Sequence, residues 1–277
     1  MVKSTLGLTT YQKRFVDTFQ RLSYKQQSWQ VWSDFILMAA CAISNRFDRA
    51  RYDEREQQYL ERIARYDEKE QKIFQELLST VVEALDADPE QDFLGNLFMQ
   101  LELGSHWKGQ FFTPYSLCRA MGEMQAGDIK TLVECKGYIS VNDPACGAGA
   151  LLIAFANAAR SKGVNYQNHV LFVAQDIDQT AALMCYIQLS LLGCAGYVVI
   201  GDTLSQPATD NLDGRDVWYT PLYFSDVWHW RRTFKKLDEL MKAAPEPAPD
   251  VIGKPERTAK LRKRTKEIDK PIQLTLF

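Results

Sequence analysis

The sequence predicts an α/β fold in which a parallel sheet follows an N-terminal helical region, and two observations support this. Up to about residue 105, apolar side chains recur at helical spacing and glycine is almost absent. From about residue 138, short apolar runs alternate with helical segments of roughly 10–15 residues, the pattern of strands joined by crossover helices. A chain of 277 residues is long enough for both parts.

The helical region is expected to form a domain over residues 1–105. The pattern between Thr10 and Phe47 fits two amphipathic helices. A partial repeat follows, with RYDEREQ at 51–57 and RYDEKEQ at 65–71. Its tyrosines recur every seventh residue, so we expect one long, solvated helix that packs through a tyrosine edge.

The sheet is expected to form a domain over residues 106–242. Four strands are predicted at 138–142, 170–174, 197–200 and 216–219. Only one further helix, at 226–242, follows the fourth strand, so we expect a truncated sheet. Residues 243–277 are rich in proline and basic residues, which predicts a disordered tail.

The composition limits the possible functions. A net charge of −2 gives no overall attraction to nucleic acid, so a DNA-binding surface must come from local clustering. No stretch approaches the roughly 18 apolar residues of a membrane helix, and no signal peptide begins the chain, so we expect a cytoplasmic protein without membrane contact. The six cysteines form no C-x-x-C pair, so neither a metal site nor a disulfide framework is predicted.

The segment DPACGAG at 143–149 separates the first predicted strand from a helix. Glycines at such a turn let the backbone approach a ligand, and the helix N-terminus supplies amide donors. Asp143 adds a carboxylate at the strand end, where open α/β sheets bind ligands. The segment is neither the dinucleotide fingerprint nor a phosphate-binding P-loop, and glycine serving turn geometry alone is the alternative.

Aspartates also follow the second and third strands. A carboxylate at Asp176 can accept both ribose hydroxyls of a nucleoside while Ile177 packs on its base. Asp202 can accept a hydrogen bond from an exocyclic amine. Each aspartate alone could equally be a helix N-cap. Together, the three strand ends favour a nucleoside-containing ligand.

These segments resemble those of the adenine-N6 DNA methyltransferases, in particular the modification subunits of type I restriction–modification systems. The segment at 143–149 resembles the S-adenosylmethionine loop of that family, and GQFFTP at 109–114 resembles its upstream motif. Gln175-Asp176 and GDTL at 201–204 match the next two motifs in order and spacing. The resemblance covers roughly residues 90–224 and implies a Rossmann-like, S-adenosylmethionine-dependent methyltransferase sheet.

The resemblance implies S-adenosylmethionine as the cofactor and assigns its contacts. The implied residues are, from the methionine end to the adenine, Gln110, Phe111, Thr113, Pro114, Asp143, Ala145, Gly147, Asp176, Ile177 and Asp202. The Thr113 hydroxyl would lie near the methionine carboxylate. Asp143, Ala145 and Gly147 would line the methionine and sulfonium region.

The catalytic motif of the family is Asn or Asp, then Pro-Pro, then Tyr or Phe, and it aligns here with TPLY at 220–223. The motif's carbonyl oxygens accept hydrogen bonds from the target amine, and its aromatic ring stacks on the flipped base. Pro221 and Tyr223 are retained, whereas Thr220 replaces the Asn or Asp. Loss of one positioned polar contact in a transition state costs about 3–4 kcal/mol. The substitution therefore weighs against methyl transfer, and much less against cofactor binding.

Two functions remain open. The first is an adenine-N6 DNA methyltransferase, in which Thr220 and nearby carbonyls accept from adenine while Tyr223 stacks on it. The second is a catalytically impaired pseudo-methyltransferase that acts as a DNA-associated or replication-associated binding protein. Methylation of a substrate other than DNA is a third possibility. The resemblance also implies DNA, and either a specificity subunit or a second copy of the chain, as partners.

Two segments near the end of the sequence suggest contacts of their own. WHWRR at 228–232 would either contact nucleic acid by stacking and charge, or seal the sheet edge as an amphipathic helix. QLTLF at 273–277 follows the basic tail and is typical of a docking peptide. It resembles the pentapeptide that binds the bacterial sliding clamp, with Gln273, Leu274, Leu276 and Phe277 in the clamp pockets. Docking back on its own domain is the alternative.

Overall fold

The computed structural model describes residues 9–24, 26–101, 103, 112–208, 211–243 and 273–275, and for 235–243 and 273–275 it describes the backbone alone. Of the predicted disordered tail at 243–277, residues 244–272 lie outside the described residues, whereas Gln273–Thr275 form a strand, so the prediction of disorder is wrong there. Four of the predicted contact residues, Gln110, Phe111, Leu276 and Phe277, also lie outside the described residues. Within the described ranges, no helix combines the length and the apolar character needed to span a bilayer.

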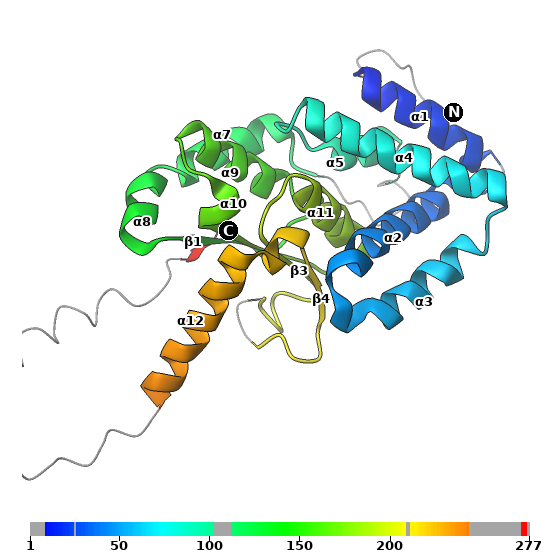
Figure 1. The fold of residues 1–277 in the computed structure, drawn as a ribbon. Coiled ribbons are helices and arrows are strands. Elements are labelled where there is room, and N and C mark those ends of the chain that lie inside the picture. The colour runs from blue at the N-terminus through cyan, green and yellow to red at the C-terminus, as the bar shows by residue number, and fades with distance from the viewer. Residues whose placement is uncertain are drawn as a thin grey trace, which may run out of the picture.

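The N-terminal region is helical, as predicted (Figure 1). It contains α1 (Thr10–Ser23), α2 (Ser28–Phe47), the short 3-10 helix η1 (Arg49–Arg51), α3 (Tyr52–Ile63), α4 (Glu68–Ala87) and α5 (Phe93–Gln100). An aromatic cluster joins three of these helices. Phe15 of α1 packs edge-on against Phe35 of α2 and Phe93 of α5, with ring centroids 5.5 and 6.2 Å apart.

The expected single long helix is in fact two helices, because the second copy of the repeat starts a new one. Asp67 caps α4: its carboxylate accepts hydrogen bonds from the amides of Lys69 and Glu70, each at 2.9 Å. The Glu70 side chain accepts from the Asp67 amide in return, which completes a capping box. Tyr66 is buried, and its hydroxyl donates to Asp34 at 2.9 Å.

The sheet contains β1 (Ile139–Asp143), β2 (Val170–Asp176), β3 (Gly196–Ile200), β4 (Asp216–Tyr219) and β5 (Gln273–Thr275), in the order β4-β3-β2-β1-β5. Its helices are α7 (Tyr115–Gln125), α8 (Ile129–Lys136), α9 (Ala150–Ser161), α10 (Tyr166–His169), α11 (Gln179–Leu191), the 3-10 helix η2 (Pro221–Phe224) and α12 (Asp226–Ala243). Strands β1, β2 and β3 are parallel, so their carboxyl ends share one edge of the sheet.

The prediction that the fourth strand extends a parallel sheet is wrong. β4 pairs antiparallel with β3, with Tyr219 opposite Tyr197 and Asp216 opposite Ile200. Beside β1, on the other side from β2, lies β5, which runs parallel to it.

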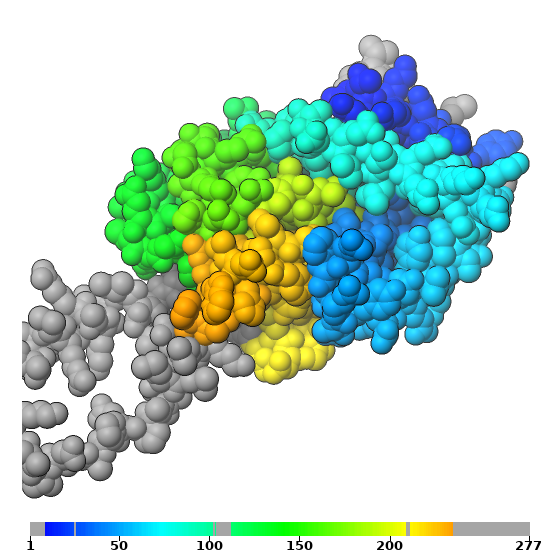
Figure 2. All heavy atoms as spheres, viewed as in Figure 1, coloured from blue at the N-terminus to red at the C-terminus, as the bar shows by residue number. Residues whose placement is uncertain are grey.

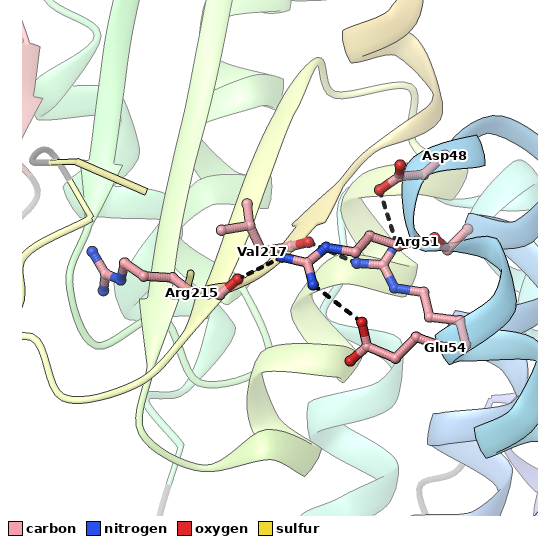
Figure 3. A network of polar contacts seen from close by, with 7 residues as sticks. Asp48, Arg51, Glu54, Arg215 and Val217 are labelled. Carbon is pink, nitrogen blue, oxygen red and sulfur yellow. Dashed lines mark hydrogen bonds and ion pairs between the residues drawn. The ribbon is translucent and has the colours of Figure 1, made fainter. Parts of the chain in front are cut away.

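Arginines of the helical region hold β4 in this position (Figure 3). Arg55 is buried and donates to the carbonyl oxygen of Val217 at 2.6 Å. Its guanidinium also lies 4.0 Å from the ring centroid of Trp218 and pairs with Asp48 at 3.0 Å. Arg51 donates to the carbonyl oxygen of Arg215 at 3.0 Å. Donors from a distant part of the sequence therefore satisfy the outer edge of β4.

The helical region and the sheet pack directly against each other. Buried side chains of both belong to one hydrophobic cluster, which extends from Phe15 to Trp218, and α11 packs on α2. Figure 2 shows the helical region, in blue and cyan, in continuous contact with the sheet region, in green and yellow.

Candidate cofactor site

The glycine turn connects β1 to α9, as predicted, and its backbone requires glycine at two positions. Gly147 and Gly149 have φ values of 52° and 92°, in the left-handed region that side chains disfavour. A Cβ on Gly147 would lie 2.9 Å from a ring carbon of Phe112, and one on Gly149 would lie 2.8 Å from the Cys185 sulfur. The turn therefore runs close to neighbouring elements on both sides.

Asp176 holds the glycine turn against the end of β2. One carboxylate oxygen accepts from the Gly147 amide at 2.8 Å, and the other accepts from the Asp178 amide at 2.9 Å. Burial raises the pKa of Asp176, and these amides oppose the rise. A carboxylate has about four lone-pair sites, so both oxygens can accept further bonds. The neighbouring Ile177 is 73% exposed, which is unusual for isoleucine and leaves its side chain available to a ligand.

A hollow of about 370 Å³ lies beside the turn. It is lined by Asp92, Phe112, Thr113, Leu117, Cys118, Met121, Asp143, Ala145, Cys146, Gly147, Ala148, Ala150 and Leu151. Its volume is within the range of small-molecule sites. The described lining contains two carboxylates and no basic side chain.

Asp143 is 4% exposed at the end of β1. Burial raises its pKa to about 6, with a smaller contribution from the charge of Asp176. The Ala145 amide, which donates to Asp143 at 3.2 Å, opposes the rise. A cationic ligand in the hollow would relieve this unfavourable charge.

The loop after β3 lies against the same turn. The Thr203 hydroxyl donates to the carbonyl oxygen of Pro144 at 2.5 Å. The Gln175 side chain donates to the carbonyl oxygens of Gly201 and Gln206 at 3.1 and 2.9 Å. Asp202, which is exposed, accepts from the Leu204 amide at 2.9 Å. The three strand-end aspartates therefore lie on adjoining loops at one edge of the sheet.

The described residues of the predicted cofactor set fall into two groups. Thr113, Asp143, Ala145 and Gly147 line the hollow, and Pro114 is the N-cap of α7 beside it. Asp176, Ile177 and Asp202 lie on the adjoining strand ends. Sequence reasoning missed Asp92, which reaches the hollow from the helical region. The signal was weak, because an aspartate before a helix is normally taken as an N-cap.

The structure does not bring the predicted catalytic residues to this edge. Thr220 is fully buried, and its hydroxyl donates to the carbonyl oxygen of Cys194 at 2.7 Å and accepts from the Gly196 amide at 2.9 Å. Both partners lie at the amino end of β3. A five-residue strand, roughly 15 Å long, separates that end from the Asp202 loop. The predicted placement of Thr220 at the cofactor edge is therefore wrong, because an antiparallel β4 ends where β3 begins.

Pro221 and Tyr223 follow Thr220 in η2. They therefore lie near the amino end of β3, at the edge of the sheet opposite the glycine turn. The Tyr223 ring stacks on Tyr219, with centroids 4.6 Å apart, and the guanidinium of Arg232 lies 4.0 Å from its centroid. The Tyr223 ring is therefore already packed against Tyr219 and Arg232 of its own chain.

The aromatic-basic segment of α12 mainly seals the domain. Trp228 is buried, and its indole donates to the carbonyl oxygen of Gln167 at 2.8 Å. Arg231 lies over the rings of Tyr138 and Trp228. These contacts agree with the sealing alternative for this segment, although Trp230 remains exposed.

Two solved structures resemble the chain at a distance. A type I restriction-modification methyltransferase subunit from Streptococcus thermophilus has 16% identity and a TM-score of 0.37, over 71% of this chain and 39% of that one. A putative class I S-adenosylmethionine-dependent methyltransferase from Listeria monocytogenes has 14% identity and a TM-score of 0.39, over 82% and 78% of the two chains. The chain thus matches about two fifths of the length of the first protein.

No curated protein matches the sequence. The family model for N-6 DNA methylases does match, over residues 96–251, which is more than half of the chain. That range includes β1 to β4, the glycine turn and the three strand-end aspartates. The chain belongs to the N-6 DNA methylase family.

Proposed function

We propose that the protein binds S-adenosylmethionine at the carboxyl edge of its sheet but does not methylate adenine, and that it acts as a DNA-associated or replication-associated binding protein. The observation that carries this proposal is the position of Thr220. Its hydroxyl is used by backbone groups at the amino end of β3. The stretch aligned with the catalytic motif is therefore far from the candidate cofactor site.

The residues present at the site fit S-adenosylmethionine. The cofactor carries a positive sulfonium, a positive ammonium and two ribose hydroxyls. Asp143 beside the hollow would favour the sulfonium, and Asp176 would accept from the ribose. Ile177 would pack on the adenine, and Asp202 would accept from its amine. When bound, the cofactor supplies an electrophilic methyl group.

The described lining of the hollow contains no side-chain amide that could replace the missing catalytic group. In the family, a side-chain carbonyl must accept from the target amine beside the cofactor. In the hollow, the described side chains with oxygen acceptors are Asp92, Thr113 and Asp143. Two of these are buried carboxylates with raised pKa values. They support the binding of a cation more directly than the recognition of an adenine.

Calorimetric titration with S-adenosylmethionine tests the binding part of the proposal. The full chain should bind, and Asp176→Ala should bind at least tenfold more weakly, because a hydrogen bond to a charged acceptor contributes about 1.5–3 kcal/mol. Asp86→Ala, a change at an exposed position of α4, is the matched control and should bind normally. Absence of binding by the unmodified chain would overturn the proposal.

We also propose that residues 273–277 dock on the bacterial sliding clamp. The backbone of Gln273–Thr275 is extended and pairs with β1, with Ser140 opposite Gln273 and Asn142 opposite Thr275, which agrees with the alternative of docking back on its own domain. Peptides that bind grooves through alternate side chains need the same extended form. Clamp binding would compete with this pairing. Purified clamp should be captured by the full chain and not by a variant lacking 273–277; equal capture would exclude the assignment.

A further inference from the structure

Asp92 combines two roles that are rarely found together. It is the N-cap of α5, and its Oδ1 accepts from the Gly95 amide at 2.9 Å and from the Gln188 side chain at 2.8 Å. It also borders the hollow beside the glycine turn. Both hydrogen bonds reach Oδ1, and no described residue donates to Oδ2. Among the described residues, the hydrogen bonds that cap α5 therefore reach only one of the two carboxylate oxygens.

The surroundings of Asp92 are shaped to keep the carboxylate in place. A Cβ on Gly95 would lie 2.0 Å from Oδ2, so only glycine fits there, although glycine within a helix is unfavourable. The Gln188 side chain, which donates to Asp92, also donates to the carbonyl oxygen of Ala148 at 2.8 Å. A single buried amide thus fixes the carboxylate relative to the glycine turn.

Asp92 and Asp143 converge on the same space from different parts of the fold. Cys118 of α7 also lines the hollow, and its thiol is close enough for the charges of both carboxylates to affect its pKa. Burial raises the pKa of its thiol to about 11, and the charges of Asp92 and then Asp143 add to the rise. Among the residues of the lining that the structure describes, no lysine, arginine or histidine balances them.

A buried carboxylate without a cationic partner is unfavourable. Asp92 is 3% exposed, and burial raises its pKa, against the opposing effect of its two hydrogen bonds. An N-cap alone does not require a charge, because asparagine caps a helix about as well. The charge is therefore explained better by a ligand than by the fold.

We propose that Asp92 binds the α-ammonium group of the methionine end of S-adenosylmethionine through its carboxylate, which borders the hollow. This assignment rests on the proposed function, and it adds a binding residue from the helical region to those on the sheet. Thr113, across the same hollow, would then face the methionine carboxylate. The amino-acid end of the cofactor would be held between α5 and the glycine turn, and binding would tie the two regions together.

The variant Asp92→Asn tests this assignment, because its side-chain oxygen can still accept from Gly95 and Gln188 while the charge is lost. Its affinity is measured calorimetrically for three compounds. S-adenosylmethionine and S-adenosylhomocysteine both carry the ammonium, whereas 5′-methylthioadenosine lacks the amino-acid part. We expect about 10- to 100-fold weaker binding of the first two, and unchanged binding of the third.

Thermal unfolding without ligand gives a second, independent readout. Asp92→Asn should raise the melting temperature, because it removes a buried charge that no described basic side chain balances. A purely structural cap would instead leave the melting temperature unchanged or lower it. Asp67→Asn alters the exposed N-cap of α4 and is the matched control, for which we expect no change in the affinity of any of the three compounds.

Three results would overturn the assignment. Equal weakening of all three compounds would indicate a structural role. Weaker binding of S-adenosylmethionine alone would place Asp92 at the sulfonium. Unchanged binding of all three compounds would exclude a contact between Asp92 and the cofactor. These outcomes differ from failure of the proposed function itself, in which the unmodified chain would bind none of the three compounds.

Discussion

Asp143 is a buried carboxylate whose pKa is raised from 3.8 to about 6. Because the raised pKa belongs to the folded state, the ionised carboxylate destabilises the fold above pH 6. This destabilisation decreases as the pH falls through 6 and is largely gone near the unfolded-state value of about 4. The difference corresponds to about 3 kcal/mol at neutral pH. A site that must accept a cation tolerates such a group.

The first prediction follows from the destabilising effect of the ionised Asp143 carboxylate. Asp143→Asn should raise the free energy of unfolding of the ligand-free protein at pH 7.5 by up to about 3 kcal/mol, and the difference should shrink as the pH falls from 6 to 4. Urea unfolding at several pH values measures it. The asparagine can still accept from the Ala145 amide, so a destabilised variant at pH 7.5 would show that the charge itself supports the fold.

The second prediction concerns Thr220. Thr220→Val removes hydrogen bonds to Cys194 and Gly196, and should lower the free energy of unfolding by about 1–3 kcal/mol without changing the affinity for S-adenosylmethionine. Thr203→Val removes the hydrogen bond to the carbonyl oxygen of Pro144 beside the glycine turn, and should weaken cofactor binding as well as stability. If Thr220→Val weakened cofactor binding while stability stayed constant, a position at the cofactor edge would be indicated.

At the scale of elements, the position of β4 depends on α3. The buried Arg55 donates to the β4 backbone, stacks on Trp218 and pairs with Asp48. Without Arg55, the Asp48 carboxylate would remain buried without its partner. Arg51, which is partly exposed, makes the neighbouring contact to Arg215.

The third prediction is that Arg55→Met lowers the free energy of unfolding by about 3–5 kcal/mol, whereas Arg51→Met changes it by about 1 kcal/mol or less. The double variant Arg55→Met with Asp48→Asn should lose less than the sum of the single changes, because the uncompensated charge is gone. Urea unfolding of all four variants measures the coupling. Equal effects of the two arginine changes would refute this account of β4.

The second element-level feature is the pairing of β5 with β1. In the fourth prediction, deletion of 273–277 increases amide hydrogen exchange in the peptide 139–143 and leaves exchange in β3 unchanged, because only β1 loses a neighbour. Added sliding clamp should have the same effect on the full chain if it takes up the segment. Unchanged exchange at 139–143 after the deletion would contradict the pairing.

At the scale of the whole molecule, local patterns predicted the strand–turn–helix geometry at the carboxyl edge of the sheet well and the strand at the amino edge poorly. The glycine turn and the aspartates at 143, 176 and 202 are set by short-range strand–turn–helix geometry, which is readable in sequence. The direction of β4 had a signal in the sequence, because no crossover helix is predicted between the third and fourth strands, and a parallel pair needs one. The contact of β4 with Arg55, which is far away in sequence, could not be read from residues 216–219. The repeat at 51–71 obscured a capping box at Asp67 that sequence patterns can identify.

The two edges of the sheet carry different features. The carboxyl edge keeps a charged hollow, the glycine turn and the aspartates, whereas the aligned catalytic stretch contributes to packing at the amino edge. The helical region contributes a residue to each edge, because Asp92 lines the hollow and Arg55 binds the backbone of β4.

The most direct test of this separation is an incubation of the full chain with DNA of mixed sequence and S-adenosylmethionine labelled on its methyl group, followed by separation of protein from DNA. We expect the protein to retain the label, Asp176→Ala to lose this retention, and the DNA to remain unlabelled. Label transferred to adenine, and lost in Tyr223→Ala, would contradict it and show an active adenine-N6 methyltransferase.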